Sequence, residues 1–175
     1  MAGATVLAFV LAAILAVRAD KPTESDLGSS APPFELVATD GTTVSLADHR
    51  GHDVLLYFSE GVGCDACFYQ QAKIEAEQQR FTDAGLRVIP VVVNPAGDVR
   101  RELDRFGLTT PFLIDPDRSV SAAYDTIGRG HHADLPGHSF VLVDRDGNMR
   151  WRMDEPSMFV EPERLVDGAV AALGR

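Results

Sequence analysis

The stretch Asp53–Gln71, DVLLYFSEGVGCDACFYQQ, decides the fold of this chain. Its first six residues, 53–58, form a nearly continuous apolar run, which is typical of a central strand covered on both faces. A short loop with two glycines follows, and residues 67–81 are rich in Ala, Gln and Glu, as expected of a helix. The stretch therefore predicts a buried strand, a tight loop, and a helix that begins at the first of two cysteines.

Cys64 and Cys67 are the only cysteines of the chain. Free backbone N–H groups and the helix dipole stabilise a thiolate at a helix N-terminus, and a second cysteine one turn further on is close enough for a disulfide. We predict a redox-active pair in which Cys64 is the exposed attacking thiolate and Cys67 the more buried resolving thiol. Asp65 works against thiolate formation by like-charge repulsion. A static disulfide or two inert core thiols are the alternatives.

A soft-metal-binding module is an alternative from another functional class. Two thiolates could be joined by His131, His132 or His138 in a four-ligand site of the zinc type. Nothing in the spacing supports such a site, and we expect these histidines to be polar loop residues. The prediction is therefore chemistry that requires neither a metal nor an organic cofactor.

Regular elements are predicted on both sides of the cysteine helix. Alternating runs on both sides of Asp40-Gly41 predict an N-terminal hairpin. Because strands then alternate with helices, we predict an α/β fold with a central mixed sheet flanked by helices. Strands are expected at 34–37, 42–45, 53–58, 86–93, 112–114, 139–144 and 149–152, and helices at 67–81, 98–106, 120–127 and 162–173.

The N-terminal residues read as a separate part of the chain. Residues 1–19 contain an apolar run that spans about 24 Å as a helix, short of the roughly 30 Å hydrocarbon core. A signal anchor and a cleavable signal peptide are both consistent with it, as is a buried or interfacial helix. No Lys or Arg precedes the run, so the positive leader of a signal sequence is missing. Residues 20–33 are polar and predict a linker to a domain at 34–175.

The charge balance bears on the class of partner. The formal net charge is −10, whereas nucleic-acid binding needs clustered Lys and Arg that displace counterions. We therefore expect no nucleic-acid partner, and we interpret the acidic surface as a source of solubility.

Four short motifs occur in order: the hairpin 34–46, the strand 54–58, the helix that opens with the cysteine pair, and the strand 139–144 with Asp146-Gly147 behind it. Together they resemble the redoxin domains of the AhpC/TSA (peroxiredoxin-like) and TlpA-like families over about residues 32–173. The resemblance implies a thioredoxin-like fold and an oxidoreductase that acts on protein thiols or disulfides, with an unidentified electron donor or acceptor. The membrane-tethered TlpA-like relatives also imply a membrane-anchored or exported protein whose redox domain lies outside the cytoplasm. By charge bias alone, Arg18 and Lys21 behind the apolar run would instead place the domain on the cytoplasmic side.

The chain departs from the peroxiredoxin motif P-x-x-x-T-x-x-C. Counting back from Cys64, its Pro and Thr positions hold Tyr57 and Gly61, and the frame of Cys67 fits no better. The arginine that partners this motif would lie at Gly137-His138. These departures favour thiol–disulfide exchange, with antioxidant reduction of a hydroperoxide as the alternative.

Three further residues are candidate accessory groups. Glu60 precedes the cysteine loop, and a buried carboxylate near the second thiol could accept its proton. A plain loop residue is an equally good interpretation of Glu60. His138 could also move a proton if its loop faces Cys64. Thioredoxin-like relatives place a cis-proline in this loop, and here Pro136 stands in it, so we expect residues 135–138 to neighbour Cys64.

Overall fold

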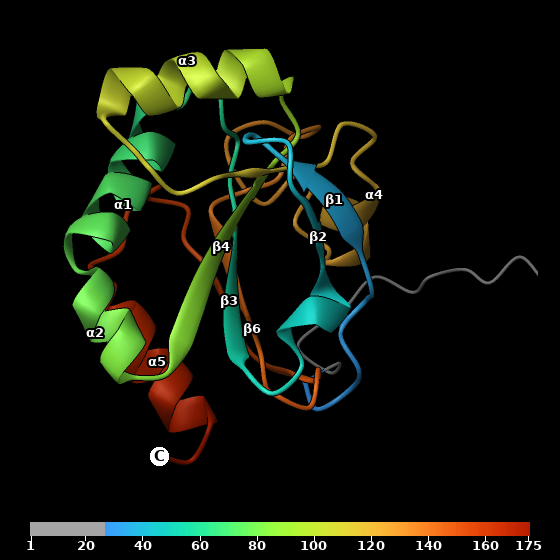
Figure 1. Ribbon diagram of the computed structural model, residues 1–175, viewed down its shortest axis with the longest axis vertical. Coiled ribbons are helices and arrows are strands. Elements are labelled where there is room, and N and C mark those ends of the chain that lie inside the picture. The colour runs from blue at the N-terminus through green and yellow to red at the C-terminus, as the bar shows by residue number, and fades with distance from the viewer. Residues whose placement is uncertain (1–26) are drawn as a thin grey trace, which may run out of the picture.

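A mixed sheet of seven strands lies between two layers of helices (Figure 1). The computed structural model describes residues 27–175. The strand order is β2-β1-β5-β4-β3-β6-β7. The strands are β1 Glu35–Ala38, β2 Thr43–Ser45, β3 Asp53–Phe58, β4 Leu86–Val92, β5 Leu113–Ile114, β6 Ser139–Val143 and β7 Met149–Asp154. The helices are η2 Leu46–His49, α1 Asp65–Ala76, α2 Gln78–Asp83, α3 Ala96–Phe106, α4 Ser119–Ala123 and α5 Pro162–Ala172.

Strand β3 is the centre of the sheet and leads to the cysteine loop. All six of its residues are buried. It pairs parallel with β4 and antiparallel with β6, and its side chains are buried in core clusters on both faces. The predicted central strand at 53–58 is confirmed, and so are the mixed sheet and the N-terminal hairpin, in which β1 pairs antiparallel with β2.

Apolar side chains fill the space on both faces of the sheet. The helices α1, α2 and α5 cover one face, and η2 and α4 lie on the other (Figure 1). Alternation along β3 divides its side chains between these two cores. The first core includes Leu55, Tyr57, Phe81, Phe140, Leu142 and Leu165, and the second includes Leu46, Leu56, Phe58, Val120, Tyr124 and Val143.

Two helices differ from their predicted extents. The single helix expected at 67–81 is two helices, because Glu77 leaves helical geometry with φ −110° and ψ 23°. The change of direction lets Phe81 of α2 pack into the core over the sheet. The helix expected at 120–127 is shorter, since Asp125 takes the left-handed conformation with φ 50° and the chain turns away there.

The last part of the predicted linker packs onto the domain. Ser30 forms a bridge with Asn148, and the backbone N–H of Ala31 donates to the carbonyl of Gly147 at 2.9 Å. The predicted anchor 1–19 and the first linker residues lie outside the described residues. Within 27–175, none of the helices is long and apolar enough to cross a membrane.

Candidate active site

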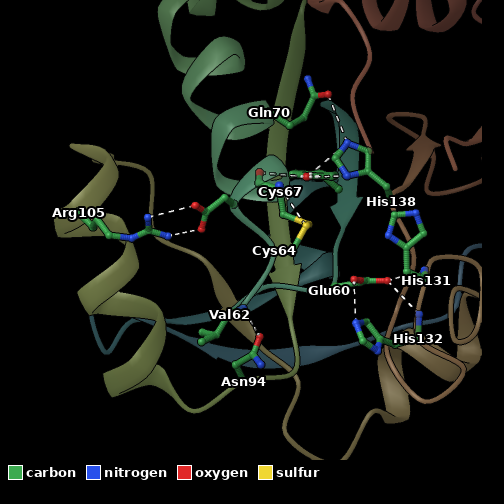
Figure 2. The surroundings of a disulfide bond; sticks show 12 residues. Glu60, Val62, Cys64, Cys67, Gln70, Asn94, Arg105, His131, His132 and His138 are labelled. Atoms are coloured by element: carbon green, nitrogen blue, oxygen red, sulfur yellow. Dashed lines mark hydrogen bonds and ion pairs between the residues drawn. A yellow bond between two sulfur atoms is a disulfide. The ribbon is translucent and has the colours of Figure 1, made fainter. Parts of the chain in front are cut away.

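Cys64 and Cys67 form a disulfide at the N-terminus of α1 (Figure 2). Their Cα atoms are 5.4 Å apart. Cys64 caps the helix, and its Sγ accepts a hydrogen bond from the backbone N–H of Cys67 at 3.2 Å. Cys64 is half-buried, whereas Cys67 is only 1% exposed. A partner that approaches from solvent therefore meets Cys64 first.

Asn94, just beyond β4, holds the loop that presents Cys64. Its Oδ1 accepts the backbone N–H of Val62 at 3.0 Å. Gly61 has φ +74°, and a Cβ at this position would collide with the Asn94 side chain. Glycine is thus required by the backbone conformation and by the close approach of another side chain. The role of Asn94 was missed from the sequence because it lies 32 positions from Val62.

A buried polar network lies beneath Cys67. The Tyr57 hydroxyl is 3.1 Å from the carbonyl oxygen of Cys67 and 3.2 Å from Nδ1 of His138. Nε2 of His138 is 3.3 Å from Oε1 of Gln70. Tyr57, Gln70 and His138 are all fully buried. Tyr57, a residue of the central strand, thus also contacts the cysteine turn.

The backbone of Val160 determines how this network is protonated. Gln70 donates from Nε2 to the Val160 carbonyl at 2.9 Å and accepts the Val160 N–H at 2.7 Å, which fixes the orientation of its amide. Oε1 of Gln70 therefore faces His138 as an acceptor. Burial lowers the pKa of His138 to about 4, so the ring is neutral at neutral pH. The single N–H of the His138 ring is then on Nε2 and donates to Gln70, so Nδ1 is an acceptor. The one proton of the Tyr57 hydroxyl is shared between this Nδ1 and the carbonyl oxygen of Cys67.

Glu60 faces the loop ahead of β6. Its side chain is buried, and Oε1 accepts the backbone N–H of His131 at 2.6 Å and of His132 at 3.2 Å. Figure 2 shows Glu60 between the cysteine turn and these histidines. A Cβ at Gly130 would collide with the same carboxylate oxygen. The carboxylate is therefore engaged in holding the loop close.

Pro136 is buried in that loop and pairs through its backbone with Ile127. Every peptide bond in the described part of the chain is trans. His138, and not a proline, directly precedes β6, and its ring lies 4.9 Å from the ring of Tyr57, centre to centre. The structure thus pairs Pro136 with Ile127, and it links His138 through the Tyr57 hydroxyl to the carbonyl of Cys67.

An ion pair adjoins the other cysteine. Nη1 of Arg105, in the last turn of α3, donates to Oδ2 of Asp65 at 3.3 Å, and Nη2 bonds Oδ1 of the same carboxylate. This contact lowers the pKa of Asp65 below its ordinary value. Arg105 was not singled out from the sequence, because it lies 40 positions from Asp65 and nothing local marks it.

The histidines considered as metal ligands have other partners. His138 is fully buried against Tyr57 and Gln70, which corrects the expectation of a polar loop residue. His131 and His132 meet Glu60. Among residues 27–175, no group of three or more His, Cys, Asp or Glu side chains is arranged to hold a metal ion.

Known proteins share this architecture and part of this sequence. A Mycobacterium tuberculosis protein (strain ATCC 25618 / H37Rv) classed as a peroxiredoxin is 35% identical to this chain. The alignment covers 74% of this chain and 85% of that protein. The thiol-disulfide oxidoreductase ResA of Bacillus subtilis (strain 168) is 32% identical, covering 63% of this chain and 61% of its own. The reduced 2-Cys peroxiredoxin of Plasmodium vivax superposes with a TM-score of 0.74 at 18% identity, covering 85% of this chain and 96% of its own.

These likenesses agree with the sheet and with the cysteine pair. The structural neighbours confirm the predicted thioredoxin-like α/β fold. The sequence model of the AhpC/TSA family matches residues 27–152, which include β1 to β6 and the cysteine helix. The chain belongs to the AhpC/TSA family.

Proposed function

We propose that this protein is a thiol–disulfide oxidoreductase that cycles Cys64 and Cys67 between dithiol and disulfide. The observation that carries the proposal is the disulfide at the start of α1, with one half-buried and one fully buried cysteine. The name of the ResA relative, a thiol-disulfide oxidoreductase, supports the same chemistry.

The reaction follows from the different access of the two sulfurs. In the reduced protein, the Cys64 thiol first loses its proton. The thiolate attacks one sulfur of a partner disulfide, and the other partner sulfur leaves as a thiolate that takes a proton. Cys67 loses its proton and attacks Sγ of Cys64, which re-forms the internal disulfide and releases the second partner thiol. The partner gains two electrons and two protons, and the cysteine pair loses them.

The accessory residues have a positioning role in this proposal. Glu60 holds the backbone of residues 131 and 132, and the same loop carries Pro136 and His138. His138 contacts Tyr57, whose hydroxyl reaches the carbonyl of Cys67. Glu60, Pro136 and His138 thereby keep one loop packed against the cysteine turn.

A peroxidase is the second candidate, because the 35% identical relative is classed as a peroxiredoxin. In that reaction the Cys64 thiolate attacks the terminal oxygen of a hydroperoxide, the O–O bond breaks, and the rest leaves as an alcohol or water. The Cys67 thiol then attacks the resulting sulfenic acid on Cys64, and the disulfide forms with release of water. Arg105, the arginine beside the cysteine turn, is already paired with Asp65 and Glu102. This pairing favours exchange with protein disulfides.

Two rates measured on the same sample separate the candidates. The fully reduced full-length chain is mixed either with hydrogen peroxide or with a protein disulfide, and the remaining thiols are counted at intervals. We expect peroxide to consume the thiols no faster than it consumes a free thiol, and the protein disulfide to consume them much faster. A peroxide rate far above that of a free thiol would make the protein a peroxidase instead.

We also propose that the redox domain works outside the cytoplasm, on protein thiols or disulfides, with residues 1–19 as anchor or export signal. The apolar composition of residues 2–17 supports a role as anchor or export signal. Full-length protein should sediment with membranes or appear in the exported fraction, whereas a chain that begins at residue 20 should do neither. Uncleaved full-length protein in the soluble cytoplasmic fraction would contradict this location.

A further inference from the structure

The carboxylate of Asp65 lies beside the attacking sulfur and has no role in the reaction proposed above. Asp65 follows Cys64 directly and is the first residue of α1. Its side chain is 71% exposed. An unpaired carboxylate here would repel a thiolate on Cys64 and would offset part of the stabilisation from the helix N-terminus.

The guanidinium of Arg105 forms a bidentate ion pair with the Asp65 carboxylate. Its two terminal nitrogens reach the two oxygens of Asp65, the geometry in which arginine binds a carboxylate best (Figure 2). In Figure 2, Arg105 lies on the opposite side of the cysteine pair from His138. The polar network beneath Cys67 and the ion pair beside Cys64 are therefore separate features.

Arg105 is fixed in place by its own helix. Its guanidinium carbon lies 4.3 Å from the centre of the Phe106 ring, and Nε donates to Glu102 at 2.7 Å. Phe106 stacks on Phe68, the residue after Cys67, with ring centres 5.5 Å apart. The packing of α3 on α1 thus delivers a positive charge to the cysteine turn.

We propose that Arg105 is a positioning residue that maintains the reactivity of Cys64 by neutralising Asp65. The proposal rests on the thiol–disulfide chemistry proposed above. Other ionisable groups near the turn are Glu102 on α3, Tyr57 and His138 beneath Cys67, and Glu60 with His131 and His132.

Charge balance predicts a pattern across three variants. Arg105→Gln leaves the carboxylate unopposed and should raise the pKa of Cys64. Asp65→Asn leaves the guanidinium opposed only by Glu102 and should lower that pKa. The double variant carries no charge at either position and should return close to the parent. Because both side chains are partly exposed and screened, each single shift should be about half a pKa unit.

The test uses the full-length chain with Cys67→Ser, in which Cys64 is the only remaining thiol. The rate of alkylation by iodoacetamide is measured against pH. Arg105→Gln should react about threefold more slowly than the parent at a pH below the thiol pKa. Arg101→Gln is the matched control, because Arg101 lies on the same helix and pairs with Asp98 instead, and it should leave the profile unchanged.

Several outcomes would overturn the proposal. One is an unchanged pKa in Arg105→Gln, and another is a shift in the same direction in both single variants, as general damage would produce. If Arg105→Gln does not fold, Arg105→Lys is the variant to test, because it keeps the positive charge and should keep the parent profile. A raised pKa of Cys64 in a folded Arg105→Lys variant would count against neutralisation. Alkylation needs no partner disulfide, so the charge pattern can hold even where exchange fails, which would refute the proposed function alone.

Discussion

Replacing Cys64 by serine is expected to abolish exchange with protein disulfides, leaving only the uncatalysed rate. Cys64 is the half-buried cysteine at the helix N-terminus, and its removal leaves only Cys67, which is 1% exposed. A buried thiol reacts poorly because burial disfavours its ionisation to the thiolate and because the partner sulfur cannot reach it. The measurement is the initial rate of reduction of a protein disulfide by the reduced variant.

The companion change, Cys67→Ser, should stall the reaction halfway. Cys64 can still attack, but no thiol is present to release the partner, so a mixed disulfide accumulates. It would appear as a covalent adduct on a non-reducing gel and disappear on reduction. If Cys64→Ser traps the partner and Cys67→Ser does not, the two roles are reversed. Thermal unfolding of both variants in reductant shows that the fold is intact.

Glu60→Ala should slow exchange about tenfold, equivalent to about 1.4 kcal/mol in the barrier, while Glu60→Gln should retain most of the rate. The alanine leaves the N–H groups of His131 and His132 without their acceptor, at a cost to stability of about 1–3 kcal/mol. The glutamine keeps an oxygen at the same place but is a far weaker base. Initial rates and chemical unfolding of both variants provide the measurements.

The two Glu60 variants distinguish positioning from proton transfer. If the carboxylate accepted the proton of Cys67, both variants would lose activity equally, and the positioning role would be wrong. His138 supplies a second readout, since burial keeps its pKa at about 4. In Glu60→Ala, a loosened loop should let that pKa rise towards the ordinary value of 6.5. Glu35→Ala, which removes an exposed carboxylate on β1, is the control that should change neither quantity.

Features that depend on neighbouring residues could be predicted from the sequence. All residues of the run 53–58 are buried in one strand, and the nearly continuous apolar composition of the run is enough to predict this burial. The spacing of Cys64 and Cys67 places both within one helical turn, so their pairing needs no distant contact. The hairpin at Asp40-Gly41 is equally local. Each of these depends on a periodicity or a turn that a few residues encode.

The helix break and the surroundings of the cysteines depended on tertiary structure. Glu77 has no helix-breaking side chain, and the helix ends there while Phe81 packs over the sheet. Local composition left Glu60 either a proton acceptor or a loop residue, because its partner His131 lies 71 positions away.

The sequence by itself thus determined the fold class, the central strand and the reactive pair, because strand and helix periods and the three-residue spacing are short-range properties. Only the tertiary structure decided which groups surround the sulfurs. His138 meets Tyr57 across 81 positions, and Arg105 meets Asp65 across 40. Such contacts exist only once β6 has paired with β3 and α3 has packed on α1, and no local pattern records which distant side chain that packing brings to the site.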